Sequence, residues 1–220
     1  MKPQRLLVAI FSVFAVFAAA PLAAITAEEI MRRNKALPKP VSSKGTVKLV
    51  VKHQGREESQ SFQVFTQTQG GITYSRINFL GASRMQFLMH SRPGAASSQW
   101  IKLSDGRIRQ VASADRGGSW AGSHFYYEDL QTYDIAKYTL RLLPEAVVAG
   151  YKKESISCYC IEATPRNQGE LYSKRIVYID KETFRIIRVQ FHERGRHTKT
   201  LTNYLFMNIA GINTPKLVYM

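Results

Sequence analysis

The sequence predicts a mainly β protein in which a long antiparallel meander curls into a half-barrel or barrel. Two observations predict this fold class. From Gly45 onward apolar residues alternate with polar ones, and short connections separate the alternating runs. A single sheet of this width has to curl, because strands twist and one face is apolar.

The first residues have the pattern of an export signal. Lys2 and Arg5 precede an apolar run over 6–20, which is short for a membrane span. We therefore expect a cleavable signal peptide over residues 1–27 and a single domain over 28–220. An uncleaved anchor is the alternative interpretation, and the expected location is the periplasm.

Residues 27–37 are expected to form a short helix. Glu28 and Glu29 suit its first turn, basic residues follow, and Pro38 and Pro40 end it. A cap over one end of the sheet is the simpler role for this helix, and a movable plug for an apolar cavity is the functional alternative.

The period changes to two after this helix. Val47, Leu49 and Val51 alternate with other residues, and Phe62 and Val64 alternate with Ser61 and Gln63. Further strands are predicted at 72–79, 85–91, 100–103, 107–111, 138–143, 157–164, 174–179, 184–193 and 197–206. Short connections such as 180–183 and 194–196 indicate antiparallel neighbours.

The stretch from residue 99 to 130 is the most informative part of the chain. Asp105–Gly106 supplies a tight turn between two strands, which predicts a hairpin. Aromatic residues then gather before Glu128–Asp129, whose acids suit a helical first turn or cap. A core aromatic cluster is the simpler interpretation, and direct ligand contact is the alternative; both hold if the core is hollow.

The chain is strongly basic. It has 31 Lys and Arg against 16 Asp and Glu, a net charge of +15, and loss of Lys2 and Arg5 with the signal leaves an excess of 13. In an exported protein this charge favours an anionic membrane surface over nucleic acid. A solvated surface without a specific partner is the alternative.

Catalytic and metal chemistry have weak support in the sequence. Ser119 only approximates a nucleophile elbow, and His192 and His197 flank a turn without completing a metal motif. Cys158 and Cys160 are equally compatible with buried thiols and with a local, strained disulfide. We expect no catalytic residue, no metal and no cofactor.

Two long segments of the sequence resemble the outer-membrane lipoprotein-sorting family, the LolA-like periplasmic proteins. The first is carried by Trp100, Leu103, Arg107, Arg109, Val111, Gly118, Ser119, Trp120, Gly122, Phe125, Tyr127, Glu128, Asp129 and Leu130. The second is carried by Tyr151, the run 158–162 with Pro165, and the run 172–201.

The resemblance implies a curved antiparallel sheet with helices covering its concave side. It also implies a carrier of lipids or lipoprotein acyl chains, with an inner-membrane export permease as a partner. Such proteins usually continue beyond the point at which this chain stops, so the expectation is a domain that lacks its last strand or strands. The alternative function is an envelope lipid or lipoprotein sensor, or an accessory interaction protein of a permease.

Three sets of residues are candidates for the site. The apolar wall of the groove is assigned to Phe62, Val64, Phe87, Met89, Trp100, Trp120 and Phe125. Ordinary sheet core is the simpler interpretation of these positions. The family motif is assigned to Gly118, Ser119, Gly122, Tyr127, Glu128, Asp129 and Leu130, and docking on the membrane or a partner to Arg185, Arg188 and Arg194.

Overall fold

The structure is a computed structural model that describes residues 24–82 and 84–220. The expected signal peptide therefore lies almost wholly outside the described residues. Helix α1 (Ala27–Lys35) comes first, and twelve strands follow within the described ranges. No helix in this part of the chain has the length and apolarity that a membrane crossing requires.

Hydrogen bonding divides the strands into two antiparallel six-stranded sheets, each in chain order. The first sheet contains β1 (Ser42–His53), β2 (Arg56–Gln69), β3 (Ile72–Leu80), β4 (Gln86–Ser91), β5 (Ser98–Lys102) and β6 (Ile108–Gln110). The second contains β7 (Tyr138–Ala149), β8 (Ser155–Pro165), β9 (Lys174–Asp180), β10 (Ile186–Glu193), β11 (Arg196–Ile209) and β12 (Ile212–Tyr219).

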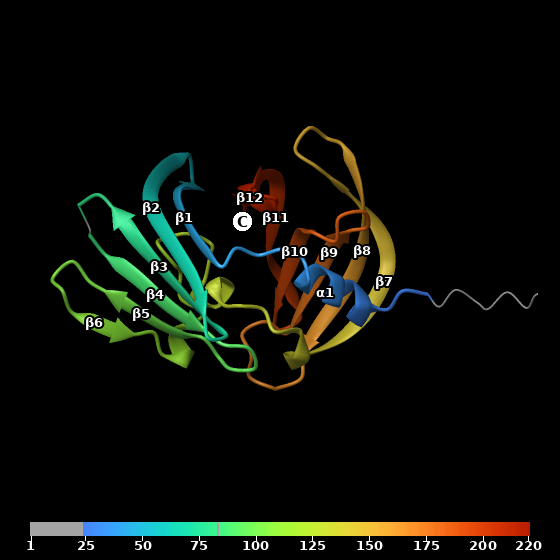
Figure 1. The fold of residues 1–220 in the computed structure, drawn as a ribbon, viewed down its shortest axis with the longest axis horizontal. Helices are drawn as coiled ribbons and strands as arrows, with labels where there is room; N and C mark the ends of the chain where they lie inside the picture. Colours follow the sequence, from blue (N-terminus) through green and yellow to red (C-terminus); the bar gives the residue numbers. More distant parts are fainter. Residues whose placement is uncertain (1–23, 83) are drawn as a thin grey trace, which may run out of the picture.

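The two sheets face each other, and α1 and residues 112–137 lie between them (Figure 1). We call residues 112–137 the linking segment. It connects β6 to β7 and contains three short 3-10 helices, η1 (Ser113–Asp115), η2 (Tyr127–Leu130) and η3 (Ile135–Lys137). The predicted fold class is confirmed: the protein is mainly β, antiparallel and curved, with short helices on the concave side. The strands form two sheets rather than one because the linking segment leaves the edge of the first sheet.

Turn chemistry sets the hairpins of the first sheet. Gly70 and Gly71 both have positive φ, which the two-residue turn between β2 and β3 requires. The expected hairpin around Asp105–Gly106 is also present, since Leu103 N–H donates to the Arg107 carbonyl at 2.8 Å. These turns fix which residues of neighbouring strands face each other.

Residues 212–219 form a strand that the sequence analysis did not predict. Ala210 and Gly211 have positive φ in the turn before it, and β12 pairs with β11. Pro215 lowers the strand propensity of this segment, but β12 is an edge strand, where a missing N–H donor is tolerated.

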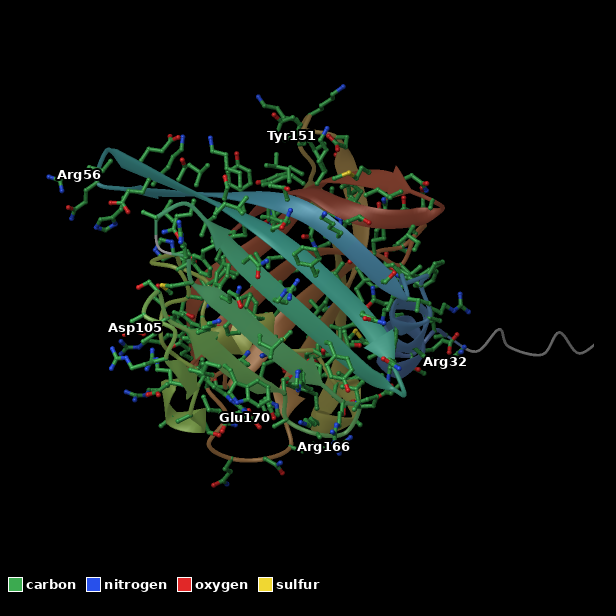
Figure 2. All side chains as sticks on the ribbon, turned by 60° about the vertical axis from the view of Figure 1, so that its left-hand side comes forward. Arg32, Arg56, Asp105, Tyr151, Arg166 and Glu170 are labelled. Carbon is green, nitrogen blue, oxygen red and sulfur yellow. The ribbon has the colours of Figure 1, made fainter. Side chains whose placement is uncertain are left out.

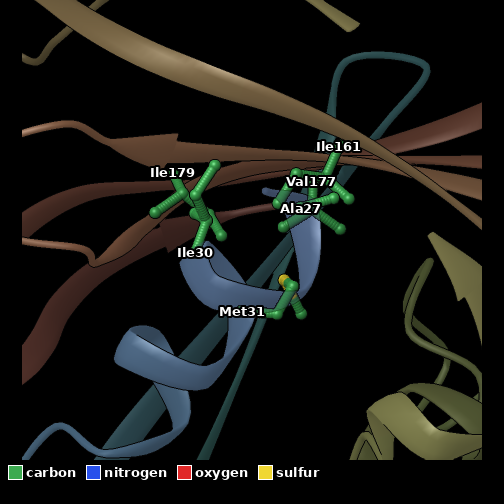
Figure 3. Packing of buried hydrophobic residues seen from close by; sticks show 6 residues of the cluster. All are labelled: Ala27, Ile30, Met31, Ile161, Val177 and Ile179. Atoms are coloured by element: carbon green, nitrogen blue, oxygen red, sulfur yellow. The ribbon is translucent and has the colours of Figure 1, made fainter. Parts of the chain in front are cut away.

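Helix α1 packs on the inner face of the second sheet through one stripe of apolar residues. Ala27, Ile30 and Met31 are buried against Ile161 of β8 and against Val177 and Ile179 of β9 (Figure 3). The Thr26 side chain accepts a hydrogen bond from Glu29 N–H, which caps the helix start. The helix occupies the concave side at this end of the molecule.

We expect Ile30→Ala to lower the free energy of unfolding by about 2–5 kcal/mol, because its fully buried side chain would leave a cavity. Lys35→Ala on the exposed side of the same helix should change it by less than about 0.5 kcal/mol. Urea unfolding followed by circular dichroism measures both. Equal effects of the two variants would show that α1 does not contribute to the core.

Candidate functional site

The inner face of the first sheet is apolar because alternation places one set of side chains there. Phe62 pairs with Phe79 of β3, and Ile77, two residues before Phe79, pairs with both Val64 and Phe87. Met89 lies two residues after Phe87 and has the same orientation. Four of the predicted groove residues therefore share the face that the linking segment covers.

Trp120 of the linking segment fills the centre of this face. Its ring centroid lies 5.1 Å from that of Phe62, 5.9 Å from that of Phe79 and 6.4 Å from that of Phe87. Phe62 is 1% exposed, Phe87 2% and Trp120 7%. We call Phe62, Phe79, Phe87 and Trp120 the aromatic cluster. The concave side is packed at this cluster, which agrees with the simpler interpretation of these positions as ordinary sheet core.

The remaining groove candidates differ in position. Val64, Met89 and Phe125 are partly buried, and the Phe125 carbonyl accepts a 2.7 Å hydrogen bond from Trp120 N–H. Trp100 lies on the opposite, outer face of the first sheet, where it pairs with Leu88. Trp100 is therefore not part of the concave wall, because the strand alternates and its neighbours Gln99 and Ile101 point inward.

A buried ion pair ties the linking segment to the second sheet. Lys199 Nζ of β11 lies 2.5 Å from Asp129 Oδ2, and their side chains are 7% and 2% exposed. Asp129 also accepts hydrogen bonds from Tyr172 Oη at 2.6 Å and from Tyr126 N–H at 2.7 Å. The last of these is the predicted cap; the partners Lys199 and Tyr172 were not predicted. Lys199 also donates to the His124 carbonyl at 2.9 Å.

Arg175 of β9 extends this group on the same face. Its guanidinium donates to Tyr138 Oη, lies 3.7 Å from Glu128 Oε1, and stacks 4.9 Å from the Tyr172 ring centroid. We call Glu128, Asp129, Tyr172, Arg175 and Lys199 the polar latch. Burial lowers the pKa of Lys199 and raises the pKa values of Glu128 and Tyr172.

The other motif residues shape the linking segment. A pocket of about 430 Å³ lies beside it and is lined in part by Gly118, Ser119 and Tyr127. Ser119 Oγ donates to the Ser123 carbonyl at 2.6 Å, so this hydroxyl supports a turn. Gly122 has positive φ in that turn, and Leu130 packs against the buried side chains around Phe87.

The three predicted docking arginines lie at three points along β10 and its flanking turns. Arg185 precedes β10, where it stacks 4.4 Å from the Phe206 ring centroid and lies 3.7 Å from Asp180 Oδ2. Arg188 donates to Thr202 Oγ1 at 3.4 Å within the second sheet. Arg194 lies in the turn at the other end of β10. We expect the contacts of Arg185 and Arg188 to contribute to stability.

Among the described residues, no group of three or more His, Cys, Asp or Glu side chains is arranged to hold a metal ion. The rings of His192 and His197 do approach each other, with centroids 5.5 Å apart. Cys158 and Cys160 are free, buried thiols, and burial raises the pKa of Cys158 to about 11. Such a thiol is a poor nucleophile at neutral pH.

Comparison with known proteins yields one family and several structures. A family model described as "Uncharacterized protein" matches residues 82–220, and no curated protein matches the chain. An outer membrane lipoprotein-sorting protein domain from Vibrio parahaemolyticus is similar, with a TM-score of 0.78, 24% identity, and coverage of 86% of this chain and 82% of that one.

Two further structures share the fold. A DUF1329 family protein from Desulfovibrio piger has a TM-score of 0.77 and 22% identity, and covers 85% of this chain and 81% of its own. The LolA superfamily protein NE2245 from Nitrosomonas europaea has a TM-score of 0.61 and 18% identity, with 89% and 84% covered. These likenesses confirm the LolA-like fold that the sequence predicted.

We expect Lys199→Met and Asp129→Asn each to lower the free energy of unfolding by about 3–5 kcal/mol, because each leaves a buried group without its partner. The matched control is the exposed pair Lys52–Glu57, where Lys52→Met should cost less than about 1 kcal/mol. Urea unfolding of the single and double variants gives the coupling energy of each pair. Equal coupling in the two pairs would contradict a special role for the latch.

The raised pKa of Glu128 predicts a pH dependence. The folded state holds the proton on this carboxyl more tightly than the unfolded chain, whose ordinary value is 4.5. Its favourable contribution is therefore present at low pH and is lost as pH rises through the folded pKa. We expect Glu128→Gln to gain stability relative to the wild type as the pH rises above 4.5, the ordinary pKa of this carboxyl. A difference in unfolding free energy that stays constant with pH would contradict this expectation.

Proposed function

This chain belongs to the family of uncharacterized proteins whose model matches residues 82–220, and we propose that it is a periplasmic carrier of acyl chains from lipids or lipoproteins. The proposed groove lies on the concave side between the two sheets. The observation that carries the proposal is an apolar inner sheet face covered by a separate segment of the chain rather than by a second sheet.

An acyl chain would lie beside the aromatic cluster and run toward the edge strand β1. Val47 pairs with Phe62 and points to the same inner face, yet it is 49% exposed. Val64 is also partly exposed on this face. Each methylene buried here contributes about 0.8 kcal/mol, so a long chain binds tightly without polar contacts.

A ligand long enough to reach the surface that Trp120 covers can enter only if the linking segment moves. Trp120 occupies the inner face of the first sheet, while Asp129 of the same segment is held by Lys199 of the second. Displacement of Trp120 would open apolar surface around Phe62 and Phe87. The segment therefore has the position of a lid whose attachment is the polar latch.

A binding role fits the chemistry of the side chains better than an enzymatic one. Ser119, Glu128 and Asp129 each make hydrogen bonds or ion pairs that hold local structure. An inner-membrane permease that loads or unloads the carrier remains part of the proposal, as does export through the expected signal over residues 1–27.

We expect the wild-type protein, purified from the cell envelope without detergent, to retain lipid that native mass spectrometry and organic extraction identify. Val47→Asn should reduce recovery about tenfold, because it places a polar group against the acyl chain. Val50→Asn is the matched control, since Val50 lies on the outer face of the same strand. Its recovery should equal that of the wild type.

A clean apo mass that persists after incubation with vesicles would contradict the carrier. That result would favour the alternative, an interaction protein with a filled core that contacts a membrane partner.

A further inference from the structure

The outer face of the first sheet carries a continuous row of basic, aromatic and aliphatic side chains. Strand pairing aligns Lys44, Phe65, Arg76, Leu88 and Trp100 across β1 to β5, one residue from each strand. In Figure 2 this face is turned toward the viewer, and no other described element covers it. The row is therefore a surface feature rather than part of the core.

Basic residues outnumber acidic ones on this face. Strand alternation places five there, namely Lys44, Lys48, Lys52, Arg76 and Lys102. Glu57 is the acidic residue that the described strand pairings place on the same face, and it binds Lys52 at 3.0 Å. The described strand positions therefore give this face five cations against one carboxylate, an excess of four positive charges.

Aromatic and aliphatic groups lie between these charges. The Arg76 guanidinium stacks 4.8 Å from the Phe65 ring centroid, and Lys44 Nζ lies 5.6 Å from it. Ile108 of β6 is 68% exposed beside Lys102, with which it pairs. Cations at the rim of exposed apolar groups are suited to an interface between water and lipid.

A shallow pocket lies within the row. Its volume is about 260 Å³, and its lining includes Arg76, Leu88, His90, Trp100 and Lys102. The Trp100 ring packs 4.8 Å from the His90 ring centroid on the pocket wall. Its lining combines the apolar Leu88 and Trp100 with the cations Arg76 and Lys102, which suits a lipid phosphate above the first carbons of its chains.

We propose that this outer face docks the protein on an anionic phospholipid bilayer, with the pocket around Trp100 at the centre of contact. The charge complementarity of the five cations selects an anionic surface, and the interspersed Phe65, Trp100 and Ile108 select a lipid one. The inference concerns the face opposite the groove, so it stands or falls independently of acyl-chain transport.

Vesicle co-sedimentation tests the charge requirement. We expect binding to vesicles of phosphatidylglycerol and phosphatidylcholine, weakening with salt, and little binding to phosphatidylcholine alone. Arg76→Gln with Lys102→Gln should weaken binding about 25-fold, since each cation contributes a factor of about five. The control is Lys152→Gln with Lys153→Gln, which removes two exposed cations from the turn between β7 and β8. Equal losses in the two double variants would overturn the proposal.

The two tryptophans report which face meets lipid. In Trp120→Phe only Trp100 emits, and in Trp100→Phe only Trp120 emits. With vesicles whose acyl chains carry bromine, docking predicts quenching of Trp100, whether or not uptake into the groove also quenches Trp120. Quenching of Trp120 alone would overturn docking and would support uptake into the groove.

Quenching of neither residue, together with no co-sedimentation, would overturn docking as well. If Trp120→Phe fails to fold, the wild type replaces it. Quenching in the wild type that is lost in Trp100→Phe then supports docking, and quenching retained in Trp100→Phe overturns it.

Discussion

The buried ion pair between Asp129 and Lys199 is the interaction on which the arrangement of the two sheets depends. The linking segment has two sides: Trp120 and Leu130 pack on the first sheet, whereas Asp129 reaches the second. A charge removed from water costs several kcal/mol unless it is paired and hydrogen-bonded. The hydrogen bond from Tyr172 and the pairing with Lys199 together meet that cost. The pair therefore holds the segment in one place with a specificity that apolar contacts alone do not provide.

The first sheet has different chemistry on its two faces, and this follows from the two-residue period of a strand. One set of residues, centred on Phe62 and Phe87, meets the linking segment and excludes water. The alternate set, centred on Arg76 and Trp100, faces outward and mixes charge with aromatic area. The carrier function that we propose needs both properties, because such a protein would receive acyl chains from a membrane. Here the two faces of one sheet provide them.

The outermost strands also have features that limit unwanted pairing. β1 and β12 are edge strands, and their free backbone groups are templates for another chain. β1 carries Lys44, Lys48 and Lys52 at every fourth position, and β12 carries Pro215, which has no N–H to donate. Charge and proline are the usual means by which open sheets avoid aggregation. An open half-barrel is therefore compatible with a protein that stays dispersed.

Local sequence patterns were enough to predict eleven of the strands, several turns and one face of the first sheet, but not β12. Period-two alternation predicted that Phe62, Val64, Phe87 and Met89 share a face, because successive side chains of a strand point to opposite sides. The acidic pair at 128–129 predicted a capped helical turn, since a cap is a local interaction. Alternation alone does not identify the inward face of a strand in which a polar residue is buried and an apolar one faces outward. Gln99 is buried because it donates to the Tyr127 carbonyl at 2.9 Å, and this places Trp100 outside.

The long-range partners depend on how separate elements pack in three dimensions. Asp129 and Lys199 are 70 residues apart, and no local pattern couples them. The split into two sheets likewise depends on where the linking segment packs. The row from Lys44 to Trp100 also follows from strand pairing between distant segments. Local sequence fixes the conformation of each element, but the free energy that selects these contacts is gained only when separate elements pack together.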